Sequence, residues 1–232
     1  MKITASYYQQ FDADLSLDVP AEGYGGWQQA EIELSPEHTA VAVMHAWEMG
    51  TPEQYPGWHR CVEYIPRARK ICAEVFPPLL SAIRRSPVRL FHVVSSGSYY
   101  KDYPGHKRAL ELSDPAPEVE HIASDPVLDK LRQFRSERVF VGMHNQEDVS
   151  RGFANLDFAP EARPVGDEAI AENSGQLFAL CREYGINHLI YIGFAIDGCL
   201  LMSPGGMIDM HRRGVMCSTV RQAVTAIENK KT

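Results

Sequence analysis

Three short apolar runs constrain the fold of this chain more than any other feature. They are TAVAVMH at Thr39 to His45, VRLFHVV at Val88 to Val94 and NHLIYIG at Asn187 to Gly193. Continuous runs of this length, with β-branched residues, are typical of strands buried on both faces of a sheet. Helical stretches separate them, and this alternation predicts a parallel sheet with right-handed crossovers. We therefore expect a three-layer α/β/α fold with a mostly parallel, doubly wound sheet.

The remaining elements are expected to continue this alternation. A helical stretch from Gly57 to Arg85 contains Pro66 and the pair Pro77 and Pro78, where a helix kinks or breaks because proline lacks an amide hydrogen. The later expected elements are a helix near Pro126 to Arg135, a strand at Arg138 to Met143, a helix at Glu168 to Tyr184, a helical segment ending at Arg213, a strand at Gly214 to Thr219 and a helix at Val220 to Asn229.

The domain organisation is expected to be simple. Residues 1–38 are polar and rich in glycine, which indicates an N-terminal arm, and residues 39–232 are expected to form a single domain. The segment from Asn145 to Gly166 is too long for an ordinary connection in such a fold, which marks it as a lid, a binding loop or an interface element.

Charge and hydropathy exclude several classes of protein. The formal net charge is −7, whereas phosphate recognition needs a basic face, so we expect no nucleic-acid partner. The longest apolar runs are far shorter than a membrane-spanning helix, and the N-terminus lacks the apolar core of a signal peptide. We therefore expect a cytoplasmic protein with no membrane partner. An odd number of cysteines without finger spacing, five in all, suits reduced thiols rather than disulfides or a zinc module.

The carboxyl ends of the predicted strands indicate where a ligand would bind. In open sheets of this kind, the crevice lies beyond those ends, at the point where the strand order reverses. The segments selected by this rule are Met44 to Trp47, Ser95 to Ser98, Met143 to Gln146 and Phe194 to Cys199.

The sequence allows two interpretations of Cys199. It follows its strand closely and opens a helical turn, where backbone amides and the helix dipole lower the pKa of a thiol. The alternative is a small apolar residue in the packing. Ser203 is expected to cap the main helix that follows, with Pro204 in its first turn. The other cysteines are expected to be inert, because they lie within apolar patterns: Cys61, Cys72, Cys181 and Cys217.

The stretch LIYIGFAIDGCLLMSPGGMIDMHRRGVMCSTVRQAVTAIE resembles the carboxyl-terminal part of the isochorismatase-like cysteine hydrolases, which include nicotinamidases and N-carbamoyl amidohydrolases. The similarity extends upstream through GQLFALCREYGI and, more loosely, to VAVMHAW. The resemblance implies a parallel α/β fold with Cys199 as nucleophile. It also implies an oxyanion hole made by the amides of Ala195 and Cys199, near a cis peptide between Phe194 and Ala195. The implied chemistry is acyl transfer through a thioester.

Two supporting residues of the family pattern have changed type. The family has an Asp at the end of strand one, where this chain has His45, and a Lys at the end of strand three, where it has Met143 or His144. Arg163 is a looser candidate for the missing cation. A histidine can serve as the base for a cysteine, but His45 can equally be a structural residue that hydrogen-bonds a backbone carbonyl.

The neighbouring residues suggest a pocket but no metal or cofactor. Trp47, beside the presumed crevice, can hold an apolar or planar ligand, although covering a helix explains it equally well. Nicotinamidases bind a metal through an Asp-x-His pair, and the loop after the second predicted strand lacks this spacing. It contains Asp102 and His106, which alone make a poor metal site. Glu168 is expected in the first turn of a helix, favoured by the dipole.

Two functions stay open from the sequence. The first is a cysteine hydrolase of a small amide, carbamoyl or ester substrate, with Cys199 as nucleophile and His45 as base. The second is a catalytically degenerate member of the fold that acts as a small-ligand-binding or oligomerisation module. A small molecule is the expected partner in the first case. The resemblance also implies a homo-oligomer.

Overall fold

The computed structural model describes residues 1–115 and 119–229, which divide into two compact units, Met1–Pro36 and Glu37–Thr232. The first unit is an antiparallel hairpin of β1 (Lys2–Gln9) and β2 (Gly26–Glu33). The loop between the two strands contains a short 3-10 helix, Pro20–Gly23. Tyr8 packs edge-on against Trp27 across the hairpin, with the ring centroids 5.4 Å apart.

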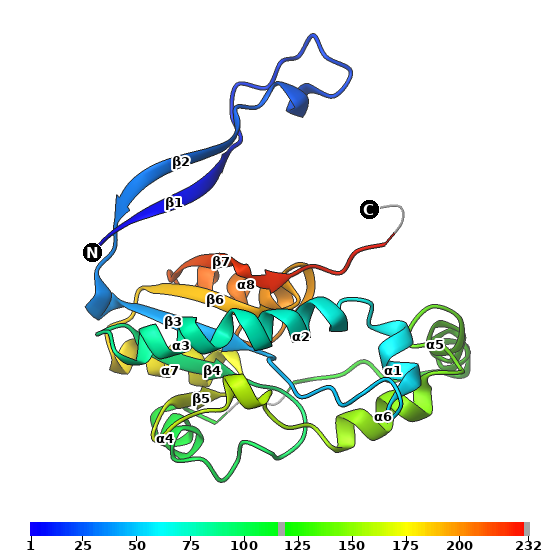
Figure 1. The fold of residues 1–232 in the computed structure, drawn as a ribbon. Coiled ribbons are helices and arrows are strands. Elements are labelled where there is room, and N and C mark those ends of the chain that lie inside the picture. The colour runs from blue at the N-terminus through cyan, green and yellow to red at the C-terminus, as the bar shows by residue number, and fades with distance from the viewer. Residues whose placement is uncertain (116–118, 230–232) are drawn as a thin grey trace. The chain divides into compact units, whose positions relative to one another are not determined.

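The second unit is built on a five-stranded parallel sheet with the order β5-β4-β3-β6-β7 (Figure 1). Its strands are β3 (Thr39–Met44), β4 (Arg89–Val93), β5 (Ala169–Ala171), β6 (His188–Phe194) and β7 (Met216–Thr225). Every residue of β3 is buried, as the continuous apolar run predicts for a central strand. The α/β prediction with a parallel sheet is confirmed.

The α-helices among the described residues are α1 (Pro56–Cys61), α2 (Ile65–Glu74), α3 (Phe76–Arg84), α4 (Pro104–Leu112), α5 (Pro126–Arg138), α6 (Gln146–Ala154), α7 (Ser174–Glu183) and α8 (Met207–Arg212). Helices α2, α3, α4, α7 and α8 cover the two faces of the sheet. Residues of α2 and α3 fill one core against Val41 and Val43, whereas residues of α4, α7 and α8 fill another against Ala40 and Ala42 (Figure 1). Successive residues of β3 thus face opposite cores, which gives the predicted three layers.

The long helical stretch after β3 breaks where the prolines predict. Helix α2 has Pro66 in its first turn, and α3 begins at Phe76, directly before Pro77. Proline is tolerated in the first turn of a helix, where its missing amide hydrogen is not needed, so each proline starts a new helix.

The predicted strand at Arg138 to Met143 is wrong. Helix α5 runs to Arg138, and turns follow it, with Gly142 at a φ of +92°. Val139, Phe140 and Met143 are all more than half exposed, so this apolar run is not buried as a strand would be. The third strand of the domain is instead β5, whose three residues, Ala169, Ile170 and Ala171, are all buried.

Three further predictions about local structure need correction. The predicted helix from Glu168 starts later, because β5 comes first and Asn173 then caps α7 by accepting a hydrogen bond from the amide of Gln176. The predicted helix at Val220 to Asn229 is wrong, since β7 continues to Thr225 and Val224 pairs with Gly193. Ser203 is not the N-cap of α8, which begins at Met207 after Gly206.

Candidate active site

The strand order creates one topological switch point in this sheet. From β3 the chain adds β4 and then β5 on one side, and it returns to place β6 and β7 on the other side. The crevice of a doubly wound sheet opens beyond the carboxyl ends of the strands at such a point, here between β3 and β6. Met44 pairs with Gly193 across these two strands, so His45 and Phe194 leave the sheet as neighbours.

Gly193 allows β3 and β6 to approach closely at the switch point. Its φ of +122° is unfavourable for other residues, and a Cβ atom there would lie 1.9 Å from the carbonyl oxygen of Met44. Only glycine fits this position without displacing the β3 backbone.

Cys199 lies in a single π-helical turn, Ile196–Leu200, directly beyond β6 and is half-buried. The turn is closed by hydrogen bonds from the amide of Leu200 to the oxygen of Ala195 (3.0 Å) and from the amide of Ser203 to the oxygen of Cys199 (3.0 Å). The peptide bond between Phe194 and Ala195 is cis, as the resemblance implies.

Two polar side chains, Tyr64 and Asp197, belong to the surroundings of Cys199. Burial raises the pKa of Tyr64, and the negative charges that Cys199 and Asp197 can carry raise it further. Asp197 in turn accepts a hydrogen bond from the amide of Ile227, at 3.0 Å. The sulfur of Cys199 is thus near a phenol that stays protonated at neutral pH.

The other cysteines behave as the sequence predicts. Burial raises the pKa of Cys72 and of Cys181 to about 12 and that of Cys217 to about 11, and it also raises the pKa of Cys61. These thiols stay protonated at neutral pH, which suits packing rather than nucleophilic chemistry.

His45 is buried and uncharged. Only 5% of it is exposed, its φ is +51°, and its backbone amide donates to the oxygen of Val93 at 3.1 Å. Burial lowers the pKa of its imidazole to about 4. Neither ring nitrogen makes a hydrogen bond to any described residue, Cys199 included. The alternative that His45 hydrogen-bonds a backbone carbonyl is therefore wrong, and the ring holds an unused proton acceptor.

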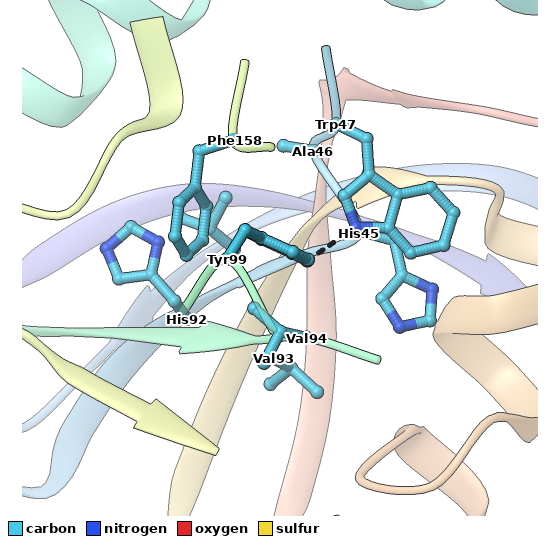
Figure 2. Close-up of a pocket in the computed structure, with 9 residues that line it drawn as sticks. His45, Ala46, Trp47, His92, Val93, Val94, Tyr99 and Phe158 are labelled. Carbon is cyan, nitrogen blue, oxygen red and sulfur yellow. Dashed lines mark hydrogen bonds between the residues drawn. The ribbon is translucent and has the colours of Figure 1, made fainter. Parts of the chain in front are cut away.

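One aromatic ring stacks on this imidazole, and further rings pack beside that ring. Trp47 stacks on His45 with centroids 4.6 Å apart, and its Nε1 donates to the Oη of Tyr99 at 2.8 Å (Figure 2). Phe158 packs edge-on against Tyr99 and forms an isolated β-bridge with Trp47. The hollow that these rings enclose with His92 is too narrow for a water molecule, so a ligand can enter only if a wall moves.

Tyr99 and Phe158 are site residues that sequence reasoning missed. Tyr99 directly follows Ser95 to Ser98, the segment at the carboxyl end of the second predicted strand. This position alone could have indicated that Tyr99 lies near the crevice. Phe158 comes from the long connection after β4, where no local pattern indicated a contact with Trp47.

Phe194 and Ala195 contribute backbone rather than side chains. The ring of Phe194 is 2% exposed and stacks on Phe76, with centroids 5.9 Å apart, so it belongs to the core. Ala195 is equally buried. The side chains of these residues are therefore not available to a ligand, and the oxyanion role of the Ala195 amide stays a prediction.

His144 and Arg163 do not lie where a strand end would place them. His144 is exposed in the turn before α6, because the strand predicted to precede it does not exist, and its carbonyl accepts from Nη2 of Arg60. Arg163 follows the 3-10 helix Pro160–Ala162 and forms an ion pair with Asp157 at 2.6 Å, which engages its charge. Neither residue lines the hollow around His45.

The residue that follows the actual third strand is Glu172. It accepts hydrogen bonds from Tyr100 at 2.7 Å and from Gln176 at 3.2 Å, and Nε2 of His106 lies 3.7 Å away. Burial opposes its ionisation, but these hydrogen bonds outweigh burial and lower the pKa of Glu172 below the usual range. An anion therefore stands after the third strand, where the resemblance implies a lysine.

Glu168 lies beside the site in a role that differs from the predicted one. It precedes β5 rather than opening a helix, and its carboxylate binds Nε2 of His92 at 2.9 Å and Nε of Arg84 at 2.6 Å. Burial alone would raise the pKa of Glu168, but the hydrogen bonds from Arg84, His92 and the amide of Val165 lower it to about 2. His92, 1% exposed, lines the hollow, so this network fixes one wall.

We expect Glu168→Gln to lower the free energy of unfolding by about 2 kcal/mol at pH 7, because it removes a partly buried, doubly paired carboxylate. The folded pKa of Glu168 lies below the unfolded one, so its contribution is complete above pH 4.5 and is lost as the pH falls toward 2. Urea melts across this range should show a steeper acid loss for the wild type than for the variant. The exposed Glu74→Gln is the control, with little change expected.

The described residues contain neither a metal-binding cluster nor a helix that could span a membrane. Within residues 1–115 and 119–229, no group of three or more His, Cys, Asp or Glu side chains is placed to hold a metal ion. Asp102 and His106 form no such group. No helix among the described residues has both the length and the apolar character needed to cross a membrane.

Comparisons with known proteins find similarity among solved structures. No family model and no curated protein matches the sequence. A cysteine hydrolase from Pseudomonas syringae pv. phaseolicola has a TM-score of 0.45 at 13% identity over 86% of this chain and 78% of its own. An isochorismatase-like hydrolase from Alkaliphilus metalliredigens has a TM-score of 0.48 at 15% identity over 83% and 84%. An isochorismatase from Pseudomonas putida KT2440 has a TM-score of 0.41 at 16% identity over 82% and 72%.

Proposed function

We propose that this chain is a cysteine-dependent hydrolase of a small amide, carbamoyl or ester substrate, with Cys199 as the nucleophile. The observation that supports this most directly is the pairing of Met44 with Gly193 at the switch point. It brings the residue after β3, His45, beside the start of the turn that carries Cys199. His45 directly follows β3, and Cys199 lies in the turn after the neighbouring β6, at the end of the sheet where folds of this class bind ligands. The imidazole nitrogens of His45 have no hydrogen-bond partner among the described residues.

The reaction would proceed in two steps. The sulfur of Cys199 bonds to the substrate carbonyl carbon while His45 takes the thiol proton, and the amides of Ala195 and Cys199 donate to the oxyanion. Collapse expels the leaving group, which takes the proton back and leaves a thioester. Water then attacks the thioester carbonyl, His45 accepts one proton from the water, and the carboxylic or carbamic acid leaves as the thiol is restored.

The protonation state of His45 fixes how it would act. With a pKa of about 4, the imidazole of His45 is unprotonated at neutral pH and is free to accept a proton. A resting thiolate–imidazolium pair is therefore not expected. Proton transfer would accompany attack on the substrate instead of preceding it.

We expect iodoacetamide at pH 7 to alkylate Cys199 ahead of the other cysteines, because burial keeps those thiols protonated. Peptide mass mapping over time gives the order. His45→Ala should leave this order unchanged, since a neutral imidazole holds no thiolate, but should lower ester turnover by about 100-fold or more. The exposed His121→Ala should change neither quantity. Alkylation of Cys199 no sooner than that of the buried Cys72 and Cys181 would contradict the proposal.

Two observations favour a second function. The hollow around His45 is closed to water, and Glu172 stands where the resemblance implies a cation. These features suit a module that binds a small ligand without turning it over. A ligand screen by thermal shift distinguishes the two functions, because a compound that raises the melting temperature without being hydrolysed supports binding alone.

A further inference from the structure

An apolar stripe on α5 lies open to solvent. Val127, Leu131 and Phe134 are each more than 60% exposed, and none of the residues of α5 is buried. Their spacing of four and then three residues places them on one face of the helix. Val139 and Phe140 follow the end of the helix and are also more than half exposed. We call Val127, Leu131 and Phe134 the α5 stripe.

We propose that the α5 stripe pairs with the same stripe of a second copy of this chain, with the two helices antiparallel. The stripe follows the spacing of the two core positions of a heptad, in which Lys130 and Glu137 occupy equivalent flanking positions seven residues apart. This inference does not depend on the chemistry at Cys199.

The flanking charges select a second copy as the occupant and fix its direction. Equivalent flanking positions face each other in an antiparallel pair, so Lys130 of each copy meets Glu137 of the other. A parallel pair would instead set Lys130 against Arg135, which repels. The antiparallel arrangement also aligns the helix dipoles favourably, and α5 already carries Asp129 in its first turn and Arg135 and Arg138 in its last turn.

The apolar surface suits a weak pair that forms as the concentration rises. The three side chains of the α5 stripe are each more than 60% exposed. Two copies of the stripe would bury roughly 700 Å², which is typical of a transient contact rather than an obligate dimer. Left uncovered, the same surface would be a liability for aggregation.

Sedimentation velocity of the full chain over a wide concentration range tests the proposal. The wild type should form a concentration-dependent dimer. The double variant Leu131→Glu with Phe134→Glu should raise the dissociation constant about 10-fold or more, because it places charges in the centre of the contact. Circular dichroism checks that the variant stays folded. A wild type that is monomeric at every concentration, or a dimer that the double variant leaves intact, would overturn the proposal.

Charge reversal tests the antiparallel direction without altering the stripe. Lys130→Glu and Glu137→Lys should each weaken the dimer, and the two together should restore it, because each restored pair spans the two copies. The matched control is Lys107→Glu, an exposed lysine of α4, which should leave the dimer unchanged. Single reversals without effect, or a double variant no tighter than the singles, would overturn the assigned pairing.

Discussion

Gly193→Ala is expected to lower the free energy of unfolding by about 4 kcal/mol or more, and in the extreme to prevent folding. The added methyl group would lie 1.9 Å from the carbonyl oxygen of Met44, and alanine is strained at a φ of +122°. Neither problem can be relieved without separating β3 from β6. Because this pair of strands aligns His45 with the start of the Cys199 turn, residual folded protein should also lose activity.

Gly198→Ala provides the matched control for this prediction. It lies in the same segment, next to Cys199, but a Cβ atom there would meet only the Cδ1 atom of Ile227, at an ordinary 3.8 Å. Equilibrium urea unfolding of both variants is the measurement, and we expect a change within about 1 kcal/mol for Gly198→Ala. Equal stabilities would show that β3 and β6 do not need the close approach at Gly193.

Most of the sheet could be predicted from the sequence because its central strands are apolar throughout. β3 and β6 have no solvent-facing side, so their runs stand out from any helical pattern. β5 could not be found in this way, because its three residues are too few to show the two-residue period of a strand. The apolar run at Arg138 to Met143 is predicted as the third strand instead of β5, although Val139, Phe140 and Met143 are exposed in the structure.

That single error explains the misplaced site residues. His144 was chosen only because it followed the wrongly predicted strand, and the true strand end leads to Glu172. Cys199 and His45 did not depend on the error, since they follow β6 and β3. The contacts of Trp47 with Tyr99 and Phe158 join segments that are distant in the sequence, which no local pattern reveals.

The change at position 45 also bears on the missing lysine. Burial shifts the imidazole of His45 to a pKa of about 4, near the usual value of an aspartate, yet its unprotonated form is neutral. A neutral base beside a thiol needs no cation to offset a carboxylate charge. Under the proposed function, the neutral imidazole of His45 can therefore accept a proton without a cation after the third strand.

Cys199→Ser is expected to reduce ester hydrolysis by about 1,000-fold or more, because a serine beside a weak base is a far poorer nucleophile than a cysteine. The stability of the fold should change little, since Cys199 is only half-buried. Cys61→Ser, another half-buried position, should retain activity and serves as the control.

The most direct measurement is the intact mass of the protein after a short reaction with p-nitrophenyl acetate and an acid quench, followed by peptide mapping. The account predicts one added acetyl group on Cys199, which disappears on longer incubation as water hydrolyses the thioester and which Cys199→Ser abolishes. Hydrolysis that continues unchanged in Cys199→Ser, or an acetyl group that appears only on other residues, would contradict a nucleophile at the switch point.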